Sequence, residues 1–124
     1  MSQNHKPRND EPVLIYTTFP SPEEAERVGG DLVDRSWAAC VAILPGVTSI
    51  YIWQGRRHRD SECVMLIKTR KNLADAVVDE VKSAHSYANP AILVLPVHGG
   101  SAEFCRWIEE QTAAPRPRDG STHL

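Results

Sequence analysis

The hydrophobic positions along the chain follow two different spacings. Continuous apolar runs rich in β-branched residues predict strands, at residues 13–19, 39–53, 62–69 and 91–97. Apolar residues three or four positions apart predict one buried helical face each, at residues 21–36, 72–84 and 101–111. Strand, helix, strand, strand, helix, strand is the split βαβ order, so we predict an α+β fold: a ferredoxin-like βαββαβ sandwich with an extended hairpin and an extra C-terminal helix.

The run at residues 39–53 is unusually long for one strand. About fifteen residues at roughly 3.3 Å each span ~50 Å, whereas a compact domain of this size has a radius of gyration of only ~13 Å. One bent strand is favoured, and a turn at Pro45–Gly46 that divides two ordinary strands is the alternative. In this topology the strand lies at a sheet edge, where bare backbone groups favour pairing with another chain. A final helix that covers the edge is the alternative to such an oligomer.

Helix and loop signals set the expected boundaries. Ser21, Pro22 and Glu24 predict a helix start with a closed capping box, and Asn72 and Ser101 are expected to cap the later helices. Gly29 and Gly30 weaken the first helix by ~1 kcal/mol each relative to alanine, and the sequence does not decide whether they permit close packing. The polar segment 54–61 is expected to connect two strands of a hairpin.

Composition narrows the class of protein. The 124 residues carry 41% hydrophobic side chains and a net charge of −2, so a single domain is expected without general attraction to nucleic acid. No apolar run approaches the ~20 residues of a membrane span. Three cysteines without metal-type spacing indicate free thiols and predict a cytoplasmic location. The polar ends predict disordered tails at 1–12 and 113–124 around a domain at 13–112.

Few residues suggest chemistry, and each has a structural alternative. Tyr51 and Trp53 share one strand face and suit an interface, a ligand cleft or ordinary cross-strand packing. Cys40 can bind copper(I) as a thiolate or simply fill core space. His85 with Tyr87 can bind metal or move protons, although a histidine at a helix C-terminus also interacts with the helix dipole. Lys68 can bind an anion or extend to solvent. No nucleophile–base pair or phosphate loop is visible, so an enzyme is not expected.

Several segments together resemble the CutA divalent-cation tolerance proteins over residues 13–112. They are residues 13–19, 21–25, 38–41, 44–51, 53–55, Glu62, 67–69 and 85–87, of which the Pro-Gly-Val-Thr-Ser-Ile-Tyr-x-Trp-x-Gly block at 45–55 is the most specific. The resemblance implies a homotrimer similar to PII-type signalling proteins, in which strands continue across subunit boundaries. It also implies a link to tolerance of copper and other divalent cations, without a defined catalytic reaction.

Carried over by position, the resemblance implies ligand clefts between subunits, lined by Tyr51, Trp53, Glu62, Lys68, His85 and Tyr87. It implies metal binding at Cys40 and His85, with copper or another divalent cation that is not required for folding. The chain departs from the family pattern His-Pro-Tyr-Glu at residues 85–88, where it reads His-Ser-Tyr-Ala. We expect the missing proline to loosen the turn and the missing carboxylate to weaken metal binding. The expected function is a trimeric cytosolic binding or sensor protein, and the alternative is a scaffold trimer that binds another protein.

Overall fold

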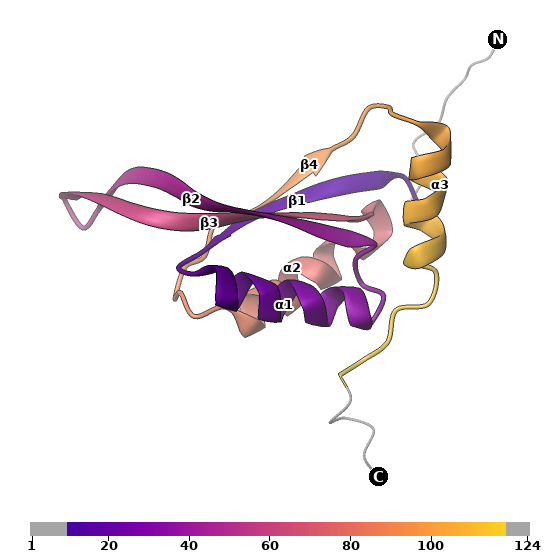
Figure 1. Cartoon of the computed structure of the whole chain (residues 1–124), viewed down its shortest axis with the longest axis horizontal. Coiled ribbons are helices and arrows are strands. Elements are labelled where there is room, and N and C mark those ends of the chain that lie inside the picture. The colour runs from indigo at the N-terminus through magenta and orange to yellow at the C-terminus, as the bar shows by residue number, and fades with distance from the viewer. Residues whose placement is uncertain (1–9, 119–124) are drawn as a thin grey trace.

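The computed structural model describes residues 10–118 and has one four-stranded antiparallel sheet in the order β2-β3-β1-β4. The elements are β1 (Pro12–Phe19), α1 (Pro22–Asp34), β2 (Cys40–Trp53), β3 (Arg56–Arg70), a 3₁₀ turn (Lys71–Leu73), α2 (Ala74–Ala84), β4 (Ile92–Pro96) and α3 (Ala102–Gln111). Helices α1 and α2 cover one face of the sheet, and α3 lies at one end of it (Figure 1). The predicted ferredoxin-like sandwich with an additional C-terminal helix is therefore confirmed.

The core lies between the sheet and the two covering helices. Alternate residues of β1 and β3 are fully buried there, among them Ile15, Phe19 and Met65. Helix α1 approaches the sheet closely at Gly29, where an added Cβ would lie 2.8 Å from Met65 Sδ and 2.8 Å from Val41 Cγ2. Gly30, one position later, has nothing within 4 Å of such a Cβ. Only the first glycine of the pair is thus needed for packing.

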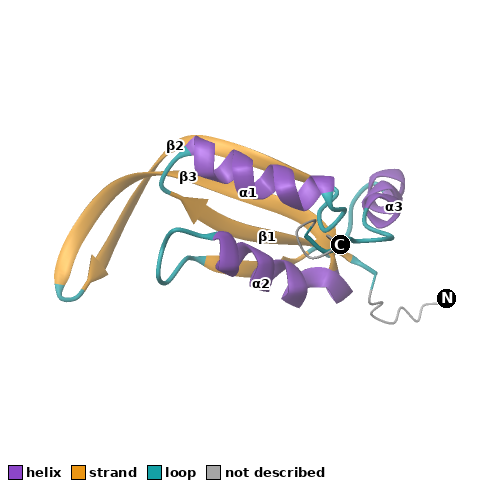
Figure 2. Cartoon of the chain, turned by 90° about the horizontal axis from the view of Figure 1, so that it is seen from below, coloured by secondary structure: helices purple, strands orange, loops and turns teal. Residues whose placement is uncertain are grey.

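Strand β2 is a single bent strand, as predicted. A β-bulge between Leu44 and Val47 absorbs the Pro45–Gly46 pair, with Gly46 at φ 76°, a backbone conformation in which glycine is not strained. Beyond the bulge, β2 and β3 form a two-stranded hairpin that projects past the helices (Figure 2). Ile50 and Ile52 on this hairpin are 55% and 67% exposed.

The outer edge of β2 is one of the two unpaired edges that the sheet has within the described residues, and the other is that of β4. Strand β2 is terminal in the sheet order, and it has no strand on its outer side within residues 10–118. Helix α3 packs against β1 and β3 instead of along the hairpin. The alternative in which the final helix covers this edge is therefore wrong for the single chain.

Two boundary predictions are wrong for physical reasons. The expected polar connection at 54–61 is reduced to the two-residue turn Gln54–Gly55, in which both residues have positive φ, 52° and 78°. Strand β3 already begins at Arg56. The hydrophobic pattern does not reveal this start, because a ribbon exposed on both sides carries polar residues and shows no apolar alternation. Asn72 does not cap α2; it lies inside the 3₁₀ turn that precedes the helix.

The other two caps are confirmed, and one of them has an unexpected partner. Ser21 Oγ accepts from the Glu24 N–H at 3.2 Å, and Ser101 Oγ accepts from the Phe104 N–H at 3.3 Å. The capping box is not closed, however, because the Glu24 carboxylate accepts from Ser86. The Ser86 N–H donates to Oε2 at 2.9 Å and the Ser86 hydroxyl donates to Oε1 at 2.8 Å.

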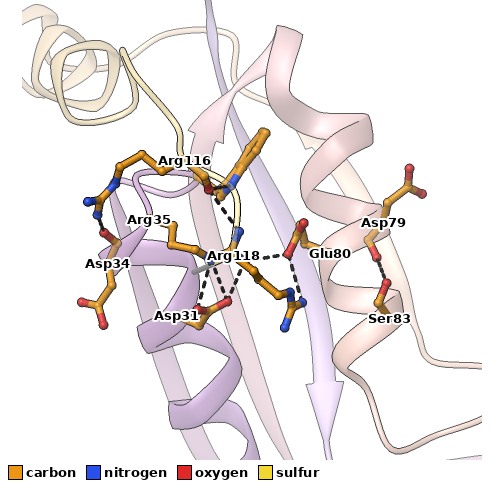
Figure 3. A network of polar contacts seen from close by, with 9 residues as sticks. Asp31, Asp34, Arg35, Asp79, Glu80, Ser83, Arg116 and Arg118 are labelled. Atoms are coloured by element: carbon orange, nitrogen blue, oxygen red, sulfur yellow. Dashed lines mark hydrogen bonds and ion pairs between the residues drawn. The ribbon is translucent and has the colours of Figure 1, made fainter. Parts of the chain in front are cut away.

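Residues 113–118, which we call the C-terminal strap, follow α3 and pack on the ends of the two covering helices. The Arg116 carbonyl accepts from Arg35 Nη1 at 3.1 Å and from Trp37 Nε1 at 2.8 Å, and the Arg116 N–H donates to the Arg35 carbonyl at 2.8 Å. The Arg118 guanidinium donates to Glu80 Oε1 on α2 at 3.1 Å (Figure 3). This part of the expected tail is therefore ordered by specific contacts.

The charged centre under the strap is Arg35, which is only 6% exposed. Its guanidinium binds both carboxylate oxygens of Asp31 and reaches Glu80 Oε1 at 2.6 Å, so it joins α1 to α2 (Figure 3). At the other end, Pro12 opens β1 and the Glu11 carbonyl accepts from the Lys71 N–H at 2.7 Å. The rest of the two predicted tails, residues 1–9 and 119–124, lies outside the described part.

Candidate functional site: a cleft at the base of the hairpin

A cleft of about 390 Å³ opens where the β2–β3 hairpin leaves the body of the sheet. Segments far apart in the sequence build it: the end of β1, both hairpin strands, and the loop between α2 and β4. Its lining residues are Thr18, Tyr51, Trp53, Asp60, Glu62, Tyr87, Ala88, Asn89 and Ala91. This is within the size range of small-ligand sites in proteins, ~300–1,000 Å³.

Two phenol–carboxylate pairs are the main polar feature of the cleft. The Tyr51 hydroxyl donates to Asp60 Oδ2, and the Tyr87 hydroxyl donates to Glu62 Oε2 at 2.7 Å. The hydrogen bond to Asp60 raises the pKa of Tyr51. Burial, and then the hydrogen bond to Glu62, raises the pKa of Tyr87. Both phenols are therefore held as proton donors that orient the two carboxylates.

The cleft is acidic. The described residues that line it include no lysine, arginine or histidine. His58 lies beside the lining, where its ring stacks on Tyr51 with the centroids 5.3 Å apart. Each carboxylate uses one oxygen for its tyrosine, and the other oxygen has no hydrogen-bond partner in the described part of the chain. Such a site attracts a cation or a hydrogen-bond donor.

His85 supports the cleft from behind and does not line it. Its buried ring stacks on Phe19 with centroids 4.3 Å apart and an interplanar angle of 8°. The Tyr87 N–H lies 3.1 Å from His85 Nδ1, so Nδ1 accepts, and the protonated Nε2 donates to the Thr18 carbonyl at 2.7 Å. Both ring nitrogens are thus used within the chain, and their role is to position Tyr87.

Lys68 does not line the cleft that the single chain forms, so its place in a cleft between subunits stays a prediction. It is six residues along β3 from Glu62, which corresponds to roughly 20 Å. Its Nζ sits 5.6 Å from the ring centroid of Phe104 on α3.

Cys40 and His85 do not form a metal site inside one chain. Across the sheet, Cys40 on β2 is level with Lys68 on β3 and with Leu14 on β1. His85 contacts Thr18, which lies four residues beyond Leu14 along β1. These two levels of the sheet are roughly 13 Å apart along the strand direction. Residues 10–118 contain no cluster of three or more histidine, cysteine or acidic side chains suited to a metal. A site that uses both residues would need two chains.

Asp60 is the main site residue that the sequence interpretation missed. It was assigned to a polar connection, although its position two residues before Glu62 is the spacing that brings strand side chains to one face. The turn at residues 85–88 also differs from expectation. Ser86 replaces the family proline, but its N–H and hydroxyl both bind Glu24, so this turn is pinned instead of loosened. Ala88, where the family pattern has a carboxylate, lines the cleft.

The fold and the cleft together define a class of small ferredoxin-like proteins in which a long β2–β3 hairpin shapes a ligand-sized site. Residues 13–111 match the family model described as CutA1 divalent ion tolerance protein. The chain therefore belongs to the CutA1 family of divalent-ion tolerance proteins.

Relatives from archaea and plants support this assignment. The divalent-cation tolerance protein CutA of Archaeoglobus fulgidus is 44% identical over 97 residues, which are 78% of this chain and 94% of the relative. The chloroplastic protein CutA 1 of Oryza sativa is 37% identical over 100 residues, 81% of this chain and 56% of the relative. The chain thus spans about half the length of this plant protein, and also of the chloroplastic protein CutA of Arabidopsis thaliana, at 55%.

Solved structures give the same result. The CutA1 crystal structure from Oryza sativa superposes with a TM-score of 0.81 at 36% identity, covering 84% of this chain and 95% of that chain. The A. fulgidus protein, described as a periplasmic divalent cation tolerance protein, superposes with a TM-score of 0.79 at 42% identity, covering 82% and 98%. Relatives are thus described as chloroplastic or periplasmic, and the cytoplasmic location of this chain stays a prediction. Within residues 10–118, no helix combines the length and apolar character needed to span a bilayer.

Proposed function

We propose that the chain acts in divalent-cation tolerance by binding a hydrated divalent cation between Asp60 and Glu62. The observation that carries this proposal is the pair of oriented carboxylates in a cleft whose described lining has no basic side chain. Hard divalent cations prefer oxygen ligands, and those of the magnesium type are commonly held by one or two carboxylates while they keep several waters. A cleft of about 390 Å³ has room for such waters, since each takes ~30 Å³.

We further propose that the working form is a homotrimer in which the hairpin of each chain pairs with a neighbour. The open outer edge of β2 and the exposed Ile50 and Ile52 support this assembly, because bare strand edges and apolar hairpins favour association. Copper binding at Cys40 and His85 is a separate proposal. It depends on this assembly, because the two residues lie apart within one chain, and on His85 giving up one of its two hydrogen bonds. The cleft itself is assigned no catalytic residue.

Equilibrium dialysis with magnesium, manganese, zinc and copper, followed by metal analysis, tests these proposals. Asp60→Asn and Glu62→Gln should each weaken binding of the hard cations at least about tenfold, because each variant removes one of two charged ligands. Glu103→Gln, on the exposed side of α3, is the matched control and should bind as the wild type does. Loss of binding in Cys40→Ser, with Glu62→Gln unaffected, would move the site to the cysteine and contradict the carboxylate proposal.

The exposed isoleucines also favour a second candidate function, a scaffold trimer whose hairpins bind another protein. Analytical ultracentrifugation of the wild type and of the double variant Ile50→Ser, Ile52→Ser separates the two roles of this surface. If the isoleucines serve assembly, the variant should dissociate. A variant that remains trimeric but loses a stoichiometric partner would support the scaffold.

A further inference from the structure

Aromatic side chains surround the two carboxylates of the cleft, although an indole or phenyl ring contributes no ligand to a hard metal ion. Tyr51, Trp53 and Tyr87 line the same cavity as Asp60 and Glu62. Trp53 remains 49% exposed, so burial in the core is not its purpose. Metal coordination of hard cations uses oxygen ligands, whereas an indole or phenol face attracts an organic cation within ~6 Å of the ring centroid.

We propose that the cleft binds small aliphatic amines in their ammonium form, and diamines in preference to monoamines. Asp60 and Glu62 are two residues apart on one strand, which separates their Cα atoms by roughly 6.6 Å. One oxygen of each carboxylate has no hydrogen-bond partner in the described chain, so it can accept from an ammonium group. A diamine can reach both acids at once, whereas a monoamine can neutralise one.

The rest of the lining suits the same class of ligand. Ala88 and Ala91 give apolar wall against which methylene groups can pack. Ala88 presents only a methyl group where the family pattern carries a carboxylate. Aliphatic amines resemble the lysine side chain, whose pKa is about 10.4, and are therefore charged at neutral pH. Charge, aromatic walls and apolar wall thus point to one chemical class.

This inference rests on the proposed function only in using the same cleft, and its test separates the two. ¹⁵N-labelled wild-type protein is titrated at fixed ionic strength with 1,4-diaminobutane, 1-aminobutane and the uncharged 1,4-butanediol, while the tryptophan indole N–H signals are followed. The Trp53 signal should move with both amines, at about tenfold lower concentration for the diamine, and should stay in place with the diol. The Trp107 signal on α3 is the internal control and should not move.

Variants assign the binding energy to the cleft. Trp53→Leu lacks the indole reporter, so its titration is followed through the backbone N–H signals of Asp60 and Glu62; it should weaken diamine binding about fivefold, as a cation–π contact of ~1 kcal/mol implies. Glu62→Gln should reduce diamine affinity to that of the monoamine, whereas Glu103→Gln should leave it unchanged. An unperturbed Trp37 signal shows that each variant is folded, because the Trp37 indole donates to the strap carbonyl of Arg116 far from the cleft.

Each outcome has a defined meaning. Binding of the diol as tightly as the diamine, or no response of Trp53 to any amine, overturns the amine proposal. Divalent cations that bind at Asp60 and Glu62 while amines do not would leave the proposed function standing alone. Amines that bind while divalent cations neither bind nor compete would support this inference and contradict the proposed function.

Discussion

The Gly29–Gly30 pair offers a matched test of how closely α1 packs on the sheet. Both glycines lie inside the same helix, so replacement by alanine should bring the same gain in helix propensity, about 0.8–1 kcal/mol each. Their surroundings differ completely, because a Cβ at Gly29 would overlap two side chains and a Cβ at Gly30 would meet open space. The difference between the two variants therefore isolates the cost of overpacking.

The magnitude follows from the contacts. Carbon atoms pack best at 3.5–4.0 Å, so a Cβ at 2.8 Å from Val41 Cγ2 and from Met65 Sδ requires shifts of roughly an ångström. Met65 is flexible but completely buried, and Val41 is β-branched with a restricted χ1. Overpacking of this kind costs about 1–3 kcal/mol. Gly30→Ala should thus stabilise the protein. The free energy of unfolding of Gly29→Ala should be about 1–3 kcal/mol lower than that of Gly30→Ala.

Denaturant unfolding of the wild type and both variants measures this difference. The protomer concentration must be equal in all three experiments, because assembly contributes to the apparent stability of an oligomer. On thermal unfolding the same gap corresponds to about 4 °C for each kcal/mol in a chain of this size. Equal free energies of unfolding for Gly29→Ala and Gly30→Ala would refute the close approach of α1 to β2 and β3.

Four further predictions concern charged, phenolic and indole groups. Arg35→Met should lower the free energy of unfolding by about 3 kcal/mol, because it removes a nearly buried guanidinium that binds two helices and the strap; a loss below about 1 kcal/mol would contradict this role. The hydrogen bond from Arg35 lowers the pKa of Asp31 below its ordinary value of 3.8. This carboxylate therefore adds stability that is complete above pH 3.8 and is lost as the pH falls through its folded pKa. In a titration of the free energy of unfolding against pH, the acid limb should be flatter for Arg35→Met than for the wild type, and identical limbs would count against the ion pair. The pKa of Tyr87 is raised above its ordinary value of 10.0, so the contribution of this phenol to the free energy of unfolding is complete below pH 10 and is lost as the pH rises further. Tyr87→Phe should flatten the alkaline limb of the same titration. An unchanged limb would show that the phenol titrates normally. Trp37→Phe removes one hydrogen bond to the strap and should cost about 1 kcal/mol by the same denaturant assay; an unchanged midpoint would show that the bond is replaced by water.

Most of the fold could be predicted because local signals and tertiary packing agree. The Ser21 and Ser101 caps, the apolar stripes of the helices and the long apolar strand all lie where their patterns place them. The start of β3 was missed because strand pairing in an exposed ribbon leaves no trace in hydrophobicity. The strap was missed because its proline and arginine content is typical of disorder, whereas its order comes from Arg35, eighty-one residues away from Arg116.

The site was predictable only in part for a related reason. Tyr51, Trp53, Glu62 and Tyr87 do come together, which alternation and the family resemblance both indicate. Whether two residues on the same strand share a cleft depends on strand register, and the Gln54–Gly55 turn and the bulge at Pro45–Gly46 set that register. Lys68 could not be placed without this information. Both ring nitrogens of His85 form hydrogen bonds with backbone groups, and these bonds likewise result from tertiary packing.

The contacts of the C-terminal strap also determine where a fusion partner or a label can be attached to this protein. Arg118 is held by Glu80 of α2, so a fusion partner or fluorescent label attached after this residue starts from the helical layer. The uncovered face of the sheet and the projecting hairpin remain free on the other side. A C-terminal reporter should therefore follow assembly in solution without obstructing it, whereas a reporter inserted at the Gln54–Gly55 turn would compete directly with the hairpin's partners.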